Sequence, residues 1–228
     1  MLEIFKASTE NVRELKKNRK KINQLINRSI KNKSKDMIPV LTKTYALTYS
    51  AFAETCFLKT IHTPYGFSED LIKQISSKRN LEKKWNKCIE LAFEQIKNMT
   101  NLGEIQNKKK RLKNLINEYV IKPSQLRNKI AHGQWKSALN TENTKINLIT
   151  TKRIKELDFV QVDNLFLIYE KISQVVEDLI ESPHKTHFRD FYIHLTELEE
   201  LVEKTKNWTI ETKTKVLIEK FEKQKAYT

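Results

Sequence analysis

The sequence has very little of the residues that make turns, with three glycines and four prolines among 228 residues. Sheet-rich proteins need many tight turns, and turns use glycine and proline heavily. Lysine, leucine, isoleucine and glutamate are frequent instead, and most of these favour helices. The shortage of turn residues therefore argues against a sheet-rich fold and predicts a chain of long helices.

Cysteine is also scarce, and the signatures of common cofactor sites are missing. Cys56 and Cys88 are the two cysteines. Both lie at apolar positions of helical patterns, so we expect buried, reduced thiols. The Cys and His residues lack the spacing of a zinc site, and the glycine-rich loops that bind nucleotides are absent. The sequence predicts neither a metal nor a cofactor.

Long apolar runs are absent too. Spanning a bilayer takes about 20 consecutive apolar residues, and the sequence has no run of that length. The first residues, Met1 to Lys6, lack the apolar segment of a signal peptide. We therefore expect a cytoplasmic protein without a membrane partner.

Basic residues are in clear excess. Lysine and arginine number 43 against 28 acidic residues, which gives a formal net charge of +15. Such an excess attracts polyanions, of which nucleic acid is the commonest and an anionic membrane surface is a rival. The abundance of Lys, Asn and Ile can also reflect an AT-rich genome. RNA is the partner that we expect.

Apolar residues recur at helical spacing along most of the chain. We expect Ser8 or Thr9 to cap the first helix and Ser68 to cap a short helix from Glu69. Pro123 is expected to interrupt the pattern, with Ser124 capping a new helix. The main expected helices span residues 8–33, 43–61, 80–98, 104–121 and 157–181, and two weaker amphipathic stretches follow Pro183. Residues 135–149 predict a short β-hairpin or extended arm.

The helix after Pro123 carries a group of residues with chemical potential: Arg127, Asn128 and His132. Asn128 and His132 are four residues apart and share a helix face. Arg127 and His132 are five apart, about 140° around the helix. A helix end loosened at Gly133, or a two-fold dimer, is needed to bring these two side chains to one cleft.

These residue types suit RNA cleavage. Histidine exchanges protons near neutral pH, so His132 is the candidate general acid or base. Arg127 can hold the scissile phosphate and stabilise charge that builds on it. The RNA's own 2′-hydroxyl would be the nucleophile, so this chemistry needs no metal, and DNA would resist it.

The segment Arg127-Asn128-Lys129-Ile130-Ala131-His132 resembles the Arg-polar-spacer-His motif of the HEPN superfamily. The resemblance covers roughly residues 40–182. It implies an α-helical bundle that dimerises around the motif, and metal-independent ribonuclease activity in toxin–antitoxin, abortive-infection or antiviral-defence systems. The same spacing recurs in residues 189–194, but Asp190 follows the arginine there, and the surroundings are an ordinary amphipathic helix.

The expected organisation is a basic N-terminal helix (1–36), a HEPN-like all-α domain (37–182) and a C-terminal helical extension (183–228). Glu54 and Lys129 are supporting candidates. Glu54 is either a buried, paired acid or a residue that orients the motif. The basic run Lys108, Lys109, Lys110 and Arg111 is either a solvated helix face or an RNA-binding surface. Trp135 is expected in the core or a dimer contact rather than as a platform for stacked bases.

Two functions fit these features. The first is a homodimeric endoribonuclease that cleaves RNA by transesterification, with Arg127, Asn128 and His132 as the site, and with a possible antitoxin or defence-system partner. The alternative is a non-catalytic RNA-binding or scaffold protein of the same type. A membrane-surface protein with an amphipathic basic helix at residues 8–33 is a third, weaker possibility.

Overall fold

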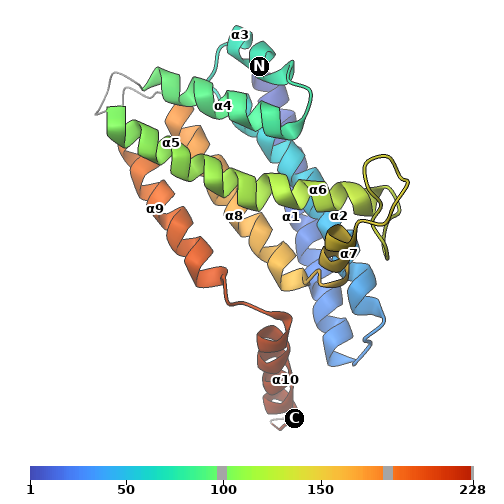
Figure 1. Ribbon diagram of the computed structural model, residues 1–228. Coiled ribbons are helices and arrows are strands. Elements are labelled where there is room, and N and C mark those ends of the chain that lie inside the picture. Colours follow the sequence, from blue (N-terminus) through green and yellow to red (C-terminus); the bar gives the residue numbers. More distant parts are fainter. Residues whose placement is uncertain (97–101, 182–186, 227–228) are drawn as a thin grey trace. The chain divides into compact units, whose positions relative to one another are not determined.

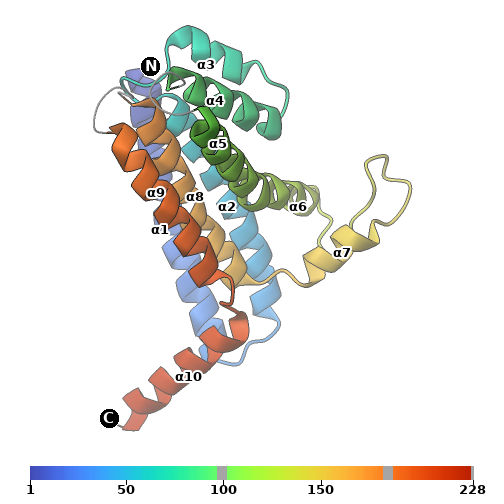
Figure 2. The same cartoon turned by 60° about the vertical axis from the view of Figure 1, so that its left-hand side comes forward.

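The computed structural model describes residues 1–96, 102–181 and 187–226. Figures 1 and 2 show the helices in order from blue to red. The elements are α1 (Leu2–Lys31), α2 (Met37–Ile61), α3 (Glu69–Ser76), α4 (Leu81–Gln95), α5 (Leu102–Ile116), the π-helical η1 (Asn117–Ile121), α6 (Lys122–Ala131), α7 (Leu148–Lys155), α8 (Phe159–Ile180), α9 (His187–Thr205) and α10 (Ile210–Ala226). The predicted all-α class is confirmed. Over the ranges described, none of the helices combines the length and apolar character needed to cross a membrane.

The predicted caps at Ser68 and at Ser8 or Thr9 had different outcomes. Ser68 caps α3 and accepts a hydrogen bond from the Leu71 N–H, as expected. The expected cap at Ser8 or Thr9 is wrong, because α1 already begins at Leu2. Thr9 lies inside that helix, and its hydroxyl donates to the Phe5 carbonyl oxygen at 2.8 Å.

Two of the prolines lie inside helices. Pro39 lies in the first turn of α2, where the backbone N–H needs no helical partner. Pro123 was expected to break the helix, but helical residues continue from 102 to 131. In a regular α-helix a proline ring clashes with the carbonyl four residues earlier. Just before Pro123 the register is wider: the Lys122 N–H donates to the Asn117 carbonyl five residues back. Ser124 is therefore inside α6 rather than at its cap.

The expected β-hairpin is absent as a pair of strands in the part of the chain that the structure describes. Leu139 and Ile146 form one isolated antiparallel bridge. From Leu148 the chain is helical, because the Asn147 side chain caps α7 by accepting the Thr150 N–H at 2.9 Å. Residues 135–147 contain no helix, so the expected arm differs from the structure only at Leu148 and Ile149, which belong to α7.

The chain groups into two compact units, each assembled from separate segments. Unit 1 contains Met1–Arg13, Ala53–Pro123 and Leu167–Lys204, and unit 2 contains Glu14–Phe52, Ser124–Phe166 and Thr205–Thr228. Each unit contains segments from all three regions predicted from the sequence, 1–36, 37–182 and 183–228.

The core of unit 1 is aromatic. The Trp85 ring of α4 lies 4.8 Å from Phe57 and 6.0 Å from Tyr169, measured between ring centroids. The Tyr169 hydroxyl donates to the Ala53 carbonyl oxygen at 2.6 Å, which satisfies this buried polar group. Both cysteines of this unit are buried and free, as predicted.

Unit 2 contains the motif helix α6, and its core combines aromatic rings with one ion pair. Phe166 lies 5.2 Å from Tyr45 and 5.0 Å from Phe52 between ring centroids. The Arg19 guanidinium donates to the Asp163 carboxylate at 2.9 Å, and the Tyr45 hydroxyl donates to the same carboxylate oxygen. Burial, followed by the negative charge of Asp163, raises the pKa of Tyr45.

Candidate functional site

The motif helix α6 ends in a Schellman motif, which fixes the backbone around His132. The Gly133 N–H donates to the Ile130 carbonyl at 3.1 Å, and the Gln134 N–H donates to the Lys129 carbonyl at 2.9 Å. Gly133 has a φ of +78°, in the left-handed region that glycine adopts without a Cβ penalty. The prediction that Gly133 ends this helix is confirmed.

The loop after Gly133 is held in place by its own polar groups. The Trp135 indole N–H donates to the Ile130 carbonyl at 3.0 Å. The Gln134 side-chain oxygen accepts the Leu139 N–H at 2.8 Å. The Ala138 N–H donates to the Thr151 hydroxyl of α7 at 2.9 Å. These bonds hold the loop against the end of α6.

Trp135 itself is not a core residue, because 39% of its surface is exposed. Of the two expected positions, the core is therefore wrong, and a dimer contact stays a prediction. The Lys43 ammonium of α2 lies 5.8 Å from the ring centroid, and the indole N–H donates to the end of α6. Trp135 therefore helps to hold the loop in place.

Helix α6 and this loop line a pocket with a cavity volume of about 670 Å³. From α6 and its C-cap the lining residues are Gln125, Asn128, Lys129 and His132. From the loop they are Gln134, Leu139, Thr141 and Asn143. The lining includes one lysine and one histidine and no carboxylate, so an anionic ligand meets no like charge there.

Asn128 and His132 are both exposed and both line the pocket, which agrees with their predicted shared face. The His132 N–H donates to the Asn128 carbonyl at 3.1 Å, one helical turn apart. Within the described residues, no hydrogen bond or ion pair occupies the His132 imidazole. The ring is therefore available for proton transfer with a bound ligand.

The Arg127 side chain does not line this pocket. It is partly buried, and its position agrees with the angle of about 140° that separates residues five apart on a helix. Of the supporting candidates, Lys129 does line the pocket, and its ammonium lies 3.4 Å from the Asn140 carbonyl oxygen. The structure thus brings together Asn128, Lys129 and His132 but not Arg127.

Glu54 is not buried, contrary to one of its two expected roles, because its side chain is exposed on α2. It also belongs to unit 1, whereas the motif residues belong to unit 2. Its role in orienting the motif stays a prediction.

Two of the four residues in the basic run on α5 are paired with acidic side chains. Lys108 forms an ion pair with Glu104 at 2.6 Å, and the Arg111 guanidinium donates to the Glu199 carboxylate of α9 at 2.7 Å. Because Lys108 and Arg111 are paired with acidic residues of unit 1, they are less able to bind a phosphate. Lys109 and Lys110 have no such partner in the part of the chain that is described.

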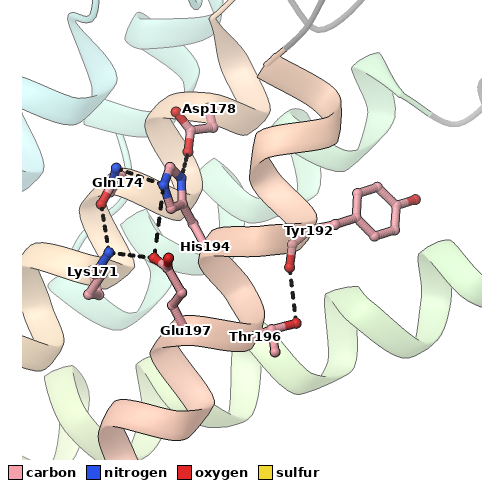
Figure 3. A network of polar contacts seen from close by, with 7 residues as sticks. All are labelled: Lys171, Gln174, Asp178, Tyr192, His194, Thr196 and Glu197. Carbon is pink, nitrogen blue, oxygen red and sulfur yellow. Dashed lines mark hydrogen bonds and ion pairs between the residues drawn. The ribbon is translucent and has the colours of Figure 1, made fainter.

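The second Arg-x4-His match has a different environment, shown in Figure 3. The His194 Nδ1 donates to the Asp178 carboxylate, and its Nε2 lies 3.1 Å from the Gln174 side-chain amide. Glu197 approaches the same nitrogen to 4.0 Å and accepts a hydrogen bond from Lys171 at 2.7 Å. That bond lowers the pKa of Glu197. His194 is thus occupied in joining α8 to α9.

The residues that complete the pocket were not predicted from the sequence. Gln125 lies three residues before Asn128 and seven before His132, so helical spacing places all three on one face and could have identified it. Gln134, Leu139, Thr141 and Asn143 carry no such signal, because the fold of the loop brings them to α6.

No protein-family model, curated protein or solved structure matches this chain. Over the described ranges, no group of three or more His, Cys, Asp or Glu side chains is placed to hold a metal ion.

Proposed function

We propose that the chain is a metal-independent endoribonuclease of the HEPN type, acting through Arg127, Asn128 and His132. The observation that carries the proposal is the position of His132: exposed in an open pocket, one helical turn from Asn128, on a backbone fixed by Gly133. The net charge of +15 supports a polyanionic substrate.

In the proposed reaction, the 2′-hydroxyl oxygen of RNA attacks the adjacent phosphorus, and the bond to the 5′-oxygen of the next nucleotide breaks. The products are a 2′,3′-cyclic phosphate and a free 5′-hydroxyl. His132 takes the proton from the nucleophile or gives one to the leaving oxygen. Arg127 stabilises the charge that develops on the phosphate, and Asn128 positions the RNA.

The position of Arg127 outside the pocket supports a homodimer as the active form. A two-fold axis near α6 would bring Arg127 of one copy to His132 of the other. A growth-arrest or antiviral-defence setting, with an antitoxin or defence partner in the cytoplasm, follows from the same family resemblance and belongs to this proposal.

The position of Arg127 also favours a second candidate: a non-catalytic RNA-binding or scaffold protein. If no second copy completes the site, His132 lacks Arg127, the cation assigned to stabilise the transition state. The excess of basic side chains then serves RNA binding without cleavage.

The test compares purified wild-type protein with the His132→Ala variant on total RNA and on tRNA, in EDTA. We expect the wild type to produce fragments that end in 2′,3′-cyclic phosphate and 5′-hydroxyl groups, and the variant to produce none. A DNA oligonucleotide of matched sequence should stay intact, because it lacks the 2′-hydroxyl. Fragments that persist with the variant contradict the role of His132, and RNA binding without cleavage by the wild type favours the second candidate.

A further inference from the structure

The lining of the pocket on α6 is unusually rich in carboxamides. Four of the residues that surround the cavity are Gln125, Asn128, Gln134 and Asn143. Two of them come from the helix and two from the loop that follows it, so a ligand in the cavity meets amide groups from both elements.

Most of this hydrogen-bonding capacity is unused. Within the described residues, the side chains of Gln125, Asn128 and Asn143 form no hydrogen bond to the protein. Gln134 uses its oxygen to accept the Leu139 N–H at 2.8 Å and keeps its amide N–H groups. A carboxamide presents a donor beside an acceptor, and unpaired bases carry such pairs on their edges.

The remaining lining selects among the bases by their N7-side edges, on which uracil offers a single acceptor, O4. An adenine presents an acceptor and a donor, N7 and N6, that a carboxamide matches with two hydrogen bonds. The corresponding edge of guanine carries two acceptors and prefers arginine or lysine, while the cytosine amino group prefers a carboxylate. The cavity has no carboxylate and no arginine, and its one lysine, Lys129, lies 3.4 Å from the Asn140 carbonyl oxygen.

We propose that this pocket is a base-recognition subsite for an unpaired adenine in single-stranded RNA, next to the phosphate that reaches His132. The inference rests on the proposed function and names its substrate class. A volume of about 670 Å³ accommodates a nucleotide. Gln125 and Asn128 contact the base from the α6 side, Asn143 contacts it from the loop, and Leu139 supplies an apolar contact.

The test uses mononucleotides, because 5′-AMP, 5′-GMP, 5′-CMP and 5′-UMP have no internucleotide bond and report binding without cleavage. Each is titrated into the wild-type protein while the side-chain amide signals of Gln125, Asn128 and Asn143 are followed by NMR. We expect 5′-AMP to shift these signals and to bind about tenfold more tightly than the other three.

Two variants locate the binding. Gln125→Ala keeps a good helix former on α6, and Asn143→Gly suits the φ of 57° at that position. Each should weaken 5′-AMP binding about tenfold, because one paired amide is lost. Asn114→Ala, an exposed change on α5 in unit 1, is the matched control and should leave the affinity unchanged.

The outcomes separate this inference from the proposed function. Equal affinity for the four nucleotides, or no shift of the three amide signals, overturns the adenine subsite even if RNA is cleaved through His132. Selective 5′-AMP binding that Gln125→Ala weakens supports the subsite even if no RNA is cleaved. For an active enzyme, mapped cuts should lie beside adenines.

Discussion

The His132 N–H donates to the carbonyl oxygen of Asn128 at 3.1 Å, and both side chains face the same pocket. This contact belongs to the last turn of α6, where the Schellman motif closes the helix. The imidazole therefore projects from a backbone with defined geometry, which is a requirement for a proton-transfer group. The Arg127 side chain does not line that pocket.

Mixing two inactive variants should restore RNA cleavage. Arg127→Ala and His132→Ala each remove one group from the site, and each should be inactive alone. In a mixed dimer whose sites take Arg127 from one copy and His132 from the other, one of the two sites is intact. After subunit exchange at equal concentrations, half of the dimers are mixed, so activity should reach about a quarter of the wild-type value. A mixture that stays inactive indicates that each site uses a single chain.

Gly133→Ala should destabilise the protein by about 1–2 kcal/mol, because a Cβ disfavours the left-handed conformation at φ +78°. Apart from its chain neighbours, no described residue has an atom within 4 Å of the position that a Cβ would take, so the cost is conformational rather than steric. Gly133→Asn is the matched control and should cost less, because asparagine tolerates this region. Urea unfolding midpoints compare the two, and equal losses would argue against a backbone origin.

The double variant Lys109→Ala with Lys110→Ala should lower the affinity for RNA and reduce the dependence of that affinity on salt. If both lysines contact phosphates of single-stranded RNA, the slope of log affinity against log salt should fall by about 0.7 for each contact. Lys73→Ala with Lys78→Ala removes the same charge from exposed positions of unit 1 and is the control. Binding curves over a range of salt concentrations give both slopes. An equal effect of the two pairs would indicate that net charge alone attracts the RNA.

Tyr45 should make the free energy of unfolding decrease at alkaline pH. Its side chain is fully buried, and burial beside Asp163 raises its pKa above the ordinary value of 10.0. Above pH 10 the unfolded chain loses this proton while the folded chain keeps it, so folding stability falls as the pH rises. The free energy of unfolding of the wild type minus that of Tyr45→Phe should be constant below pH 9. At pH 11 this difference should be smaller by about 1.4 kcal/mol. Urea unfolding at pH 8 and pH 11 measures this change, and a difference that is independent of pH contradicts it.

Much of the helical architecture could be predicted from short segments. The spacing of apolar residues indicated the long helices, Ser68 marked the start of α3, and Gly133 marked the end of α6. The failures also have local causes. Pro123 lies within a helix because a π-turn precedes it, and the two strands of the expected hairpin are replaced by one bridge, after which Asn147 caps α7.

The candidate site could be predicted only in part, for a physical reason. Asn128 and His132 share a face because a helix repeats every 3.6 residues, and the sequence alone determines that relation. The other wall of the pocket depends on contacts between residues distant in the chain, such as the bond from the Ala138 N–H to the Thr151 hydroxyl. That contact holds the base of the loop that contains Asn143.

The sequence by itself determined the helical class, the basic charge and the spacing of Arg127, Asn128 and His132, because these follow from composition and helix periodicity. Only the tertiary structure decided which copy of the Arg-x4-His spacing has an available histidine. His194 is engaged by Asp178 and Gln174, whereas His132 faces an open pocket. The spacing is identical in the two copies, and the difference lies in the side chains that neighbouring elements bring to each ring.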